Sequence, residues 1–282
     1  MTFLQALLIA ILQGVTELFP VSSLGHAVVL PKLVGWDNVN QKDPHFLPFL
    51  VVLHLGTATA LLLYFWRDWI DLFLTFIGRG APERKAANWR TIILIVVATI
   101  PAVVIAVPLA EFIRKQLFSS PTVAAAFLIV NGFVLFFGER LRRKSAGTRK
   151  IADMNWVDAV KIGLWQSLAL IPGISRSGTT MVGGLLAGLH HKESAHFSFL
   201  IATPIIWGAT VHEAPRLLHQ DGGMGLTPLV WVSGIVAGVT AYISIAFLMR
   251  YFRKHDFEAL NPFAYYCWGF GAISLGLLLF VF

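Results

Sequence analysis

Long apolar segments alternate with short polar ones along most of the chain. Six uninterrupted apolar runs each approach the roughly 20 residues that a helix needs to cross a bilayer. These runs cover residues 46–66, 91–110, 121–139, 193–213, 227–249 and 261–282. They are continuously apolar rather than alternating with a period of two residues, which argues against transmembrane β-strands and indicates helices. We therefore predict an all-α integral membrane protein with six full spans.

Two further apolar regions are interrupted by polar residues and are too short to cross the membrane twice. Residues 3–34 are interrupted at Pro20, and residues 156–189 are interrupted at Pro172 and Gly173. Proline ends a helix, and each remaining half is shorter than a span. Each region therefore predicts a re-entrant hairpin, which leaves the membrane on the side where it entered.

The order of one hairpin followed by three spans occurs twice. It covers residues 1–143 and again residues 155–282, and the basic segment 144–154 connects the two halves. Three crossings per half are an odd number, so the second half has the opposite orientation in the membrane. The pattern predicts two inverted-topology repeats with ten helices in total.

The composition indicates a membrane protein, and the positions of its basic residues predict its orientation in the membrane. Hydrophobic residues make up 56% of the chain and charged residues 13%, where soluble domains carry about 25% charged residues. If the first hairpin opens to the outside, sixteen Lys and Arg residues lie near the inner ends of the spans and five near the outer ends. Positive charge favours the cytoplasmic side, so both termini are expected outside and residues 144–154 inside. The net charge of +7 therefore sets topology and does not indicate nucleic-acid binding.

The first hairpin carries polar side chains that are costly at membrane depth and are therefore candidates for function. Gln13 and Glu17 lie on one helix face, and Ser23 and His26 are three residues apart on the next helix. A serine hydroxyl near an imidazole predicts a nucleophile beside a base. Glu17 could orient the imidazole, act as the base itself, or bind a divalent cation together with Gln13.

The second hairpin carries a different set of polar groups. Ser175, Arg176, Ser177, Gly178 and Thr180 open its second helix. Free backbone N–H groups, hydroxyls and a guanidinium at a helix N-terminus suit phosphate oxygens. If the two hairpin tips meet at mid-depth, the combined site supports phosphoryl transfer, with Ser23 or an activated water attacking phosphorus.

Other polar residues within the spans carry a weaker signal. His54, His196 and Thr203 could line a cavity, but a buried histidine with one partner is more often structural. Cys267 is the only cysteine of the chain, which excludes an intrachain disulfide and a multi-cysteine metal site.

At its two polar segments the chain resembles the undecaprenyl-diphosphate phosphatase family of bacterial inner membranes, also known as bacitracin-resistance proteins. Residues 13–26 fit the pattern E/Q-x-x-x-E followed by P-V-S-S-x-G-H, and residues 172–180 fit P-G-x-S-R-S-G-x-T. The order of elements agrees along essentially the whole chain. Gln13 stands where many relatives carry glutamate, which puts the charge of this motif on Glu17.

The resemblance implies hydrolysis of undecaprenyl diphosphate to undecaprenyl phosphate, the lipid carrier recycled for peptidoglycan, and bacitracin resistance. It also implies a divalent cation, Mg²⁺ or Ca²⁺, and a site open to the outer face of the inner membrane. The residues that it implies for catalysis are Glu17, Ser23, His26 and Arg176, and those for phosphate binding are Ser22, Ser175, Ser177, Gly178 and Thr180. Ser23 is the preferred candidate for the nucleophile, a water molecule is the second candidate, and His26 is the third. A homodimer is compatible with the sequence.

Two other functions are alternatives to a phosphatase of this kind. Inverted repeats with broken helices are typical of secondary transporters, and a polyprenyl-phosphate flippase would share that architecture. Ser23 and His26 beside a phosphate-binding segment favour hydrolysis, which transport does not require. A phosphatase of the acid-phosphatase superfamily would need a histidine and an aspartate downstream of Ser175 and Arg176, and the sequence has Val182 instead of that histidine.

Overall fold

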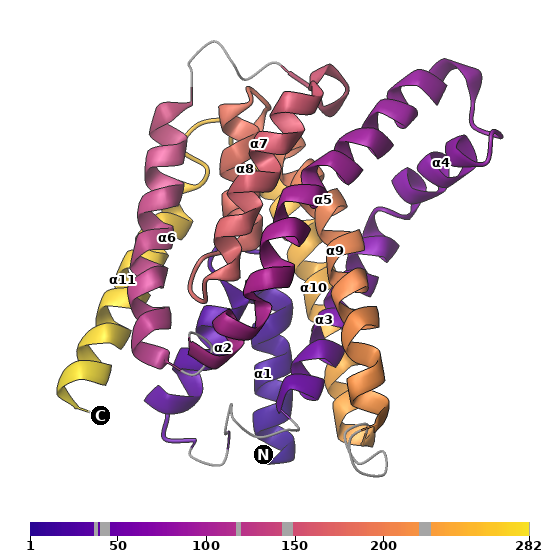
Figure 1. The fold of residues 1–282 in the computed structure, drawn as a ribbon. Coiled ribbons are helices and arrows are strands. Elements are labelled where there is room, and N and C mark those ends of the chain that lie inside the picture. Colours follow the sequence, from indigo (N-terminus) through magenta and orange to yellow (C-terminus); the bar gives the residue numbers. More distant parts are fainter. Residues whose placement is uncertain (37–38, 40–45, 117–119, 143–148, 220–226, 282) are drawn as a thin grey trace.

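The computed structural model describes residues 1–36, 39, 46–116, 120–142, 149–219 and 227–281. These residues are mostly helical and contain no β-strand, which confirms the predicted all-α class (Figure 1). Residues 143–148, which make up most of the expected basic connector, lie outside the described residues.

Eleven α-helices form the described part of the chain. The first half contains α1 (Phe3–Thr16), α2 (Ser23–Leu33), α3 (Phe46–Tyr64), α4 (Trp66–Phe76), α5 (Pro82–Gln116) and α6 (Pro121–Leu141). The second half contains α7 (Trp156–Ser167), α8 (Arg176–Leu186), α9 (His191–His219), α10 (Pro228–Lys254) and α11 (Asn261–Phe280). Short 3₁₀ turns lie at Ile151–Asp153 and Leu168–Leu170.

Five of the described helices, α5, α6, α9, α10 and α11, are long and apolar enough to cross a membrane. α3 passes the same test only together with α4, and the two are bent by 78° where they join. The described residues therefore hold five spans, or six if this bent pair counts as one. The predicted multi-pass helical protein is confirmed at that level.

Ten helices were predicted and the described residues form eleven, because, between the predicted spans 46–66 and 91–110, no helix was assigned to residues 67–90. They form α4 and the start of α5, which begins at Pro82 rather than at residue 91. Apolar residues at Trp66, Ile70 and Phe73 follow the helical period. Charged residues between them interrupt the segment, so it contains no continuous apolar run that would predict a helix.

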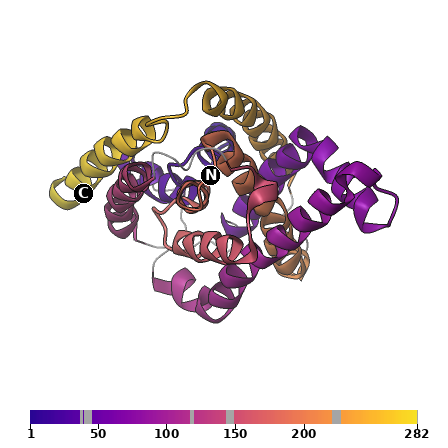
Figure 2. The ribbon, with the colours of Figure 1, turned by 90° about the horizontal axis from the view of Figure 1, so that it is seen from above.

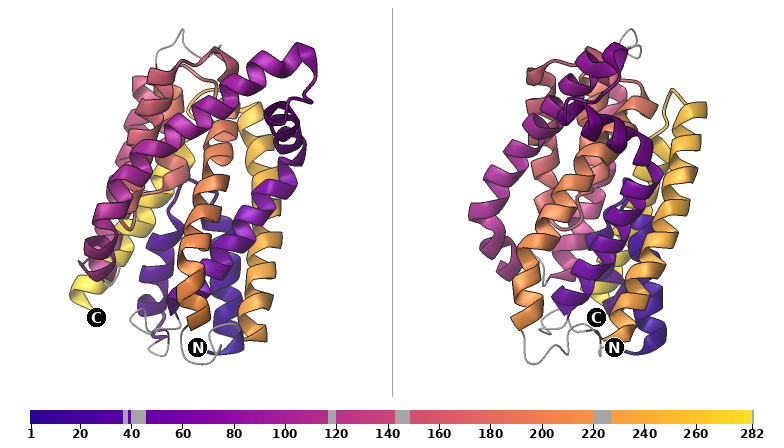
Figure 3. Two further views of the ribbon diagram at one scale, coloured as in Figure 1. Left: turned by 45° about the vertical axis from the view of Figure 1, so that its right-hand side comes forward. Right: turned by 90° about the vertical axis from the view of Figure 1, so that its right-hand side faces the viewer.

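The two short hairpins enter the molecule from opposite ends. In Figures 1 and 3 both termini lie at one end, α1 and α2 form a hairpin from that end, and α7 and α8 form one from the other. α1 packs against α10, and α7 packs against α5, so each hairpin contacts a long helix of the other half. Figure 2 shows the long helices arranged around the hairpins. The tips of the hairpins meet inside this ring.

Close backbone contact at the tips requires glycine. Gly173 has a φ of +100°, and a Cβ built on it would lie 2.4 Å from the Ala124 carbonyl oxygen of α6. A Cβ on Gly25 of α2 would lie 3.1 Å from the Gly173 Cα. The two tips therefore touch backbone to backbone, which brings their side chains within hydrogen-bond distance.

Candidate active site

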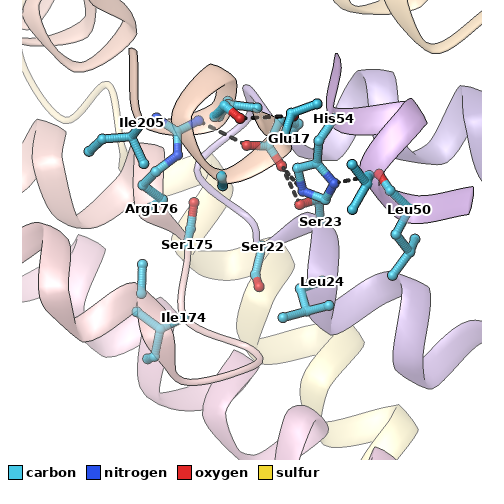
Figure 4. Close-up of a pocket in the computed structure, with 15 residues that line it drawn as sticks. Glu17, Ser22, Ser23, Leu24, Leu50, His54, Ile174, Ser175, Arg176 and Ile205 are labelled. Carbon is cyan, nitrogen blue, oxygen red and sulfur yellow. Dashed lines mark hydrogen bonds and ion pairs between the residues drawn. The ribbon is translucent and has the colours of Figure 1, made fainter. Parts of the chain in front are cut away.

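A cavity of about 290 Å³ lies where the two tips meet α3 and α9 (Figure 4). Its polar lining from both tips and from α3 consists of Glu17, Ser22, Ser23, His54, Ser175 and Arg176. Thr210 of α9 also lines it, with its hydroxyl bonded to the Ile206 carbonyl at 2.9 Å. Its remaining wall is mostly aliphatic and includes Leu24, Leu50, Val51, Ile174, Ile205 and Ile206. The cavity therefore has one polar end and one apolar side.

Glu17 is the centre of the polar end. Its Oε1 accepts a hydrogen bond from Arg176 Nη2 at 2.9 Å, which is also an ion pair. Its Oε2 accepts from the Ser23 hydroxyl at 2.6 Å and from the Gln13 amide at 3.1 Å. The His54 Nε2 lies 3.5 Å from the same oxygen. One buried carboxylate thus joins both tips to α3, and its pairing with Arg176 offsets part of the cost of burying its charge.

Ser23 and Arg176 occupy the same position in the two hairpins, because each is the first residue of its helix after a serine cap. The Ser22 hydroxyl accepts the backbone N–H three residues ahead at 3.2 Å, and the Ser175 hydroxyl does the same at 3.1 Å. Ser22 has a φ of +70°, an unusual value outside glycine. Each cap fixes the direction in which the next side chain leaves the backbone, and both next side chains reach Glu17.

Asn131 of α6 forms a hydrogen bond to each of the two tips and so links them. Its amide nitrogen donates to the Pro20 carbonyl and its oxygen accepts from the Ser175 backbone N–H, both at 2.9 Å. The Ser177 hydroxyl adds a bond to the Phe19 carbonyl at 3.1 Å. The sequence interpretation missed Asn131, although an amide inside an apolar span was a usable signal.

His26 does not pair with Ser23, so that expectation was wrong. Its Nδ1 lies 2.6 Å from the Ser22 carbonyl and its Nε2 lies 2.8 Å from the Tyr266 hydroxyl. A carbonyl only accepts, so Nδ1 carries the proton and Nε2 accepts from Tyr266. The ring also stacks on Phe270, with 4.7 Å between centroids. His26 is fully buried on the side of α2 that faces α11 and does not line the cavity.

The imidazole that does line the cavity is that of His54. Its Nδ1 bonds to the Leu50 carbonyl at 2.8 Å, which turns Nε2 toward Glu17. The sequence interpretation gave His54 less weight than His26, although it is an ionisable residue inside a predicted span. His196 faces Asp68 of α4 instead, and the Thr203 hydroxyl bonds within its own helix.

The predicted phosphate-binding residues divide into two groups. Ser22 and Ser175 line the cavity together with Arg176, whereas Ser177, Gly178 and Thr180 lie behind it. The Thr180 hydroxyl bonds to the Arg176 carbonyl at 2.8 Å and contacts Ser198. A Cβ on Gly178 would lie 3.0 Å from Leu135. The second group therefore holds the tip in place.

The cavity has an unused hydrogen-bond donor. Arg176 Nη1 is buried and has no hydrogen-bond partner among the described residues. A buried guanidinium nitrogen without a partner is costly, and an anion bound in the cavity would satisfy it.

A metal ion bound by protein side chains alone fits this set of residues poorly. The described residues contain no group of three or more His, Cys, Asp or Glu side chains that could hold one. Among the described residues that line the cavity, Glu17 is the single carboxylate, and Gln13 is the amide beside it. Because Mg²⁺ takes one or two carboxylates together with phosphate oxygens, a cation fits here together with a phosphorylated ligand.

Comparison with known proteins supports a single family. The family described as "Bacitracin resistance protein BacA" matches residues 6–273. A protein named undecaprenyl-diphosphatase from Granulibacter bethesdensis is 54% identical over 97% of each chain. One of the same name from Acidiphilium cryptum is 54% identical over 99% of each chain. A third, from Mycolicibacterium paratuberculosis, is 41% identical over 98% of this chain and 97% of its own.

Proposed function

The chain belongs to the bacitracin-resistance protein family, and on this premise we propose that it hydrolyses undecaprenyl diphosphate to undecaprenyl phosphate and inorganic phosphate. The observation that carries this function is the Glu17 carboxylate, which is bound by the Ser23 hydroxyl and by Arg176 inside a cavity with one polar end. Such an arrangement suits a phosphoryl group. The activity recycles the lipid carrier for peptidoglycan and underlies bacitracin resistance in this family.

In the proposed reaction Ser23 is the nucleophile. Its oxygen forms a bond to the terminal phosphorus, the bond from that phosphorus to the bridging oxygen breaks, and undecaprenyl phosphate leaves. The Ser23 proton passes to Glu17 Oε2, which already accepts it in a hydrogen bond of 2.6 Å. Water then hydrolyses the phosphoserine and releases phosphate. His26 is the least favoured nucleophile, because both of its ring nitrogens are engaged elsewhere.

Arg176 has a separate role for each of its terminal nitrogens. Nη2 holds Glu17, and Nη1 is free to bind the phosphoryl oxygens and stabilise charge that develops on them. The Ser22 hydroxyl lines the cavity beside it and can donate its hydrogen to the same oxygens, whereas the Ser175 hydroxyl donates to Ser177 Oγ at 3.0 Å, because Ser177 donates to the Phe19 carbonyl. The aliphatic wall of the cavity suits the first units of the prenyl chain.

A divalent cation, Mg²⁺ or Ca²⁺, is part of the proposal. It would neutralise charge on the diphosphate oxygens, and Glu17 and Gln13 are the side chains that would hold it together with those oxygens.

We also propose that residues 1–143 and 155–282 are inverted-topology repeats, with the cavity open to the periplasm. Three observations support this arrangement: both termini lie at one end, the hairpins enter from opposite ends, and each hairpin packs on the other half. The excess of basic residues near the other end of the spans favours placing that end in the cytoplasm.

The test is phosphate release from undecaprenyl diphosphate by the purified protein, with and without Mg²⁺ or Ca²⁺. Glu17→Ala and Arg176→Ala should lose activity, whereas Arg253→Ala, at an exposed site on α10, should retain it. Full activity in the first two variants would overturn the site. Lipid translocation in liposomes without hydrolysis would support the transporter or flippase alternative.

A further inference from the structure

Residues 66–90 form a helical elbow that projects from the rest of the protein at the end opposite the termini (Figures 1 and 3). It consists of α4, the turn after it and the first turns of α5. Leu72 and Thr75 are the buried residues of α4. The Asn88 amide of α5 donates to the Thr75 hydroxyl at 3.0 Å, which fixes this face of α4 against α5. The opposite face of α4 points outward.

That outward face is an apolar stripe. Trp66, Ile70, Phe73 and Ile77 follow one another at intervals of four, three and four residues, which places them on one side of a helix. Their side chains are between 45% and 61% exposed. We call these four residues the α4 stripe. An exposed apolar stripe on a short helix beside membrane spans indicates a partner that is itself apolar.

The charges of the elbow add a second requirement on that partner. The elbow carries five basic residues and three acidic ones. Asp71 is paired with Arg84 at 2.9 Å, and Asp68 faces His196. Arg79 and Lys85 are exposed and have no acidic partner within the described parts of the chain. The elbow therefore presents unpaired positive charge next to an apolar stripe.

We propose that the elbow is a binding surface for anionic lipids. The α4 stripe would lie in the acyl-chain boundary of the nearer leaflet, and Arg79 and Lys85 would bind the lipid phosphates. Tryptophan and basic residues on an amphipathic helix match this interfacial position, and each basic residue near an anionic surface adds to the attraction. Trp89 of α5 is also exposed and suits the headgroup level above the stripe.

A second copy of the chain is a poorer match for this surface. α4 has 11 residues and is therefore about 16 Å long. The area of four side chains along such a helix is well below the roughly 800 Å² that each partner buries in a stable protein interface. A lipid surface has no such threshold, because each exposed side chain partitions into it separately.

Site-directed spin labelling in vesicles tests the proposal. Cys267 is buried, so a label can be placed at one introduced cysteine at a time. Phe73→Cys probes the α4 stripe, Val103→Cys on the exposed face of α5 is the control within a span, and Ala86→Cys is the control at the start of α5. Accessibility to oxygen and to a water-soluble nickel chelate reports depth. Vesicles of phosphatidylcholine alone are compared with vesicles containing phosphatidylglycerol, and retained phosphatase activity shows that each variant is folded.

The ratio of oxygen to nickel accessibility should be several-fold higher at the Phe73 site than at the Ala86 site, and should rise further with phosphatidylglycerol. The rise should disappear when Arg79→Gln and Lys85→Gln are added. A ratio at the Phe73 site equal to that at Ala86 would overturn the proposal. So would a ratio that does not change with lipid charge, or spin–spin broadening that grows with protein density and indicates a second copy on the stripe.

Discussion

Ser23 and Arg176 bind the two oxygens of one carboxylate, that of Glu17, from equivalent positions in the two hairpins. Each is the first residue after a serine cap, but the backbone of the two caps differs, with a φ of +70° at Ser22 and −86° at Ser175. The two halves of the chain therefore supply a hydroxyl and a guanidinium from the same helix position, through different local backbone. Neither hairpin alone contains a complete site.

Replacing Ser23 by alanine should lower kcat by about 100-fold or more, because the proposed nucleophile is lost. The wild-type enzyme should form a phosphoserine at Ser23 when it is quenched early in turnover, which mass spectrometry of the digested protein can detect. Thermal unfolding should change little. Activity close to wild type in Ser23→Ala, with no phosphopeptide in the wild type, would leave water as the nucleophile.

Replacing Arg176 by lysine should also lower kcat by about 100-fold. A single ammonium group cannot bind Glu17 and the phosphoryl oxygens in the geometry of the two guanidinium nitrogens. The matched control is Arg253→Lys on α10, which should retain full activity. Steady-state phosphate release checks both variants, and equal activity in the two would remove Arg176 from the reaction.

His54→Gln should be milder than His54→Leu. Glutamine can still donate a hydrogen bond toward Glu17, whereas leucine leaves that side of the carboxylate without a polar neighbour. We expect a loss of about 10-fold or less in kcat for glutamine and a clearly larger loss for leucine. Equal activity in both variants would show that the imidazole only fills space.

Tyr266→Phe separates two roles of His26. The substitution removes the hydroxyl that bonds to His26 Nε2 and should cost about 1 kcal/mol in the free energy of unfolding. If His26 only positions the first tip, kcat should stay within a few-fold of wild type. A drop of two orders of magnitude or more, without loss of folded protein, would instead place the His26 imidazole in the reaction.

Asn131→Leu should destabilise the protein and impair catalysis together. The substitution leaves the Pro20 carbonyl and the Ser175 N–H without their partner, at about 1–3 kcal/mol for each buried group. The control is Cys267→Ala, which removes the weak contact of Asn131 with a thiol at 3.3 Å and the packing of one buried sulfur atom, but leaves both tip hydrogen bonds in place. The thermal unfolding temperature and kcat should both fall in Asn131→Leu, and both should stay near wild type in the control.

Much of the architecture could be predicted from the sequence, because a helix that crosses the membrane is recognisable as a long continuous run of apolar residues. The two hairpins were found because Pro20 and Pro172 interrupt segments already too short to cross. α4 was missed because its apolar side chains share an 11-residue helix with charged ones. Such an amphipathic helix looks polar when only average hydropathy is considered.

The sequence was enough to predict most residues of the site, but not which of them contact one another. Glu17, Ser23 and Arg176 stand out as costly polar groups at membrane depth, and the structure brings them together. His26 was expected beside Ser23 from a spacing of three residues. That spacing permits a contact but does not select it, and here Tyr266, from the last helix, holds the imidazole. Contacts between distant helices of this kind leave no trace in local sequence patterns.

The ion pair between Glu17 and Arg176 joins residues separated by 159 positions, which bears on how the protein is made. During synthesis from the N-terminus, Glu17 enters the membrane long before its cationic partner exists. Until α7 and α8 are inserted, Glu17 therefore lacks the guanidinium and has Gln13, Ser23 and His54 of its own half beside it. Insertion of the second hairpin thus brings Arg176 to Glu17, and the later helices α9 and α11 complete the site, because α9 lines the cavity and Tyr266 of α11 holds His26.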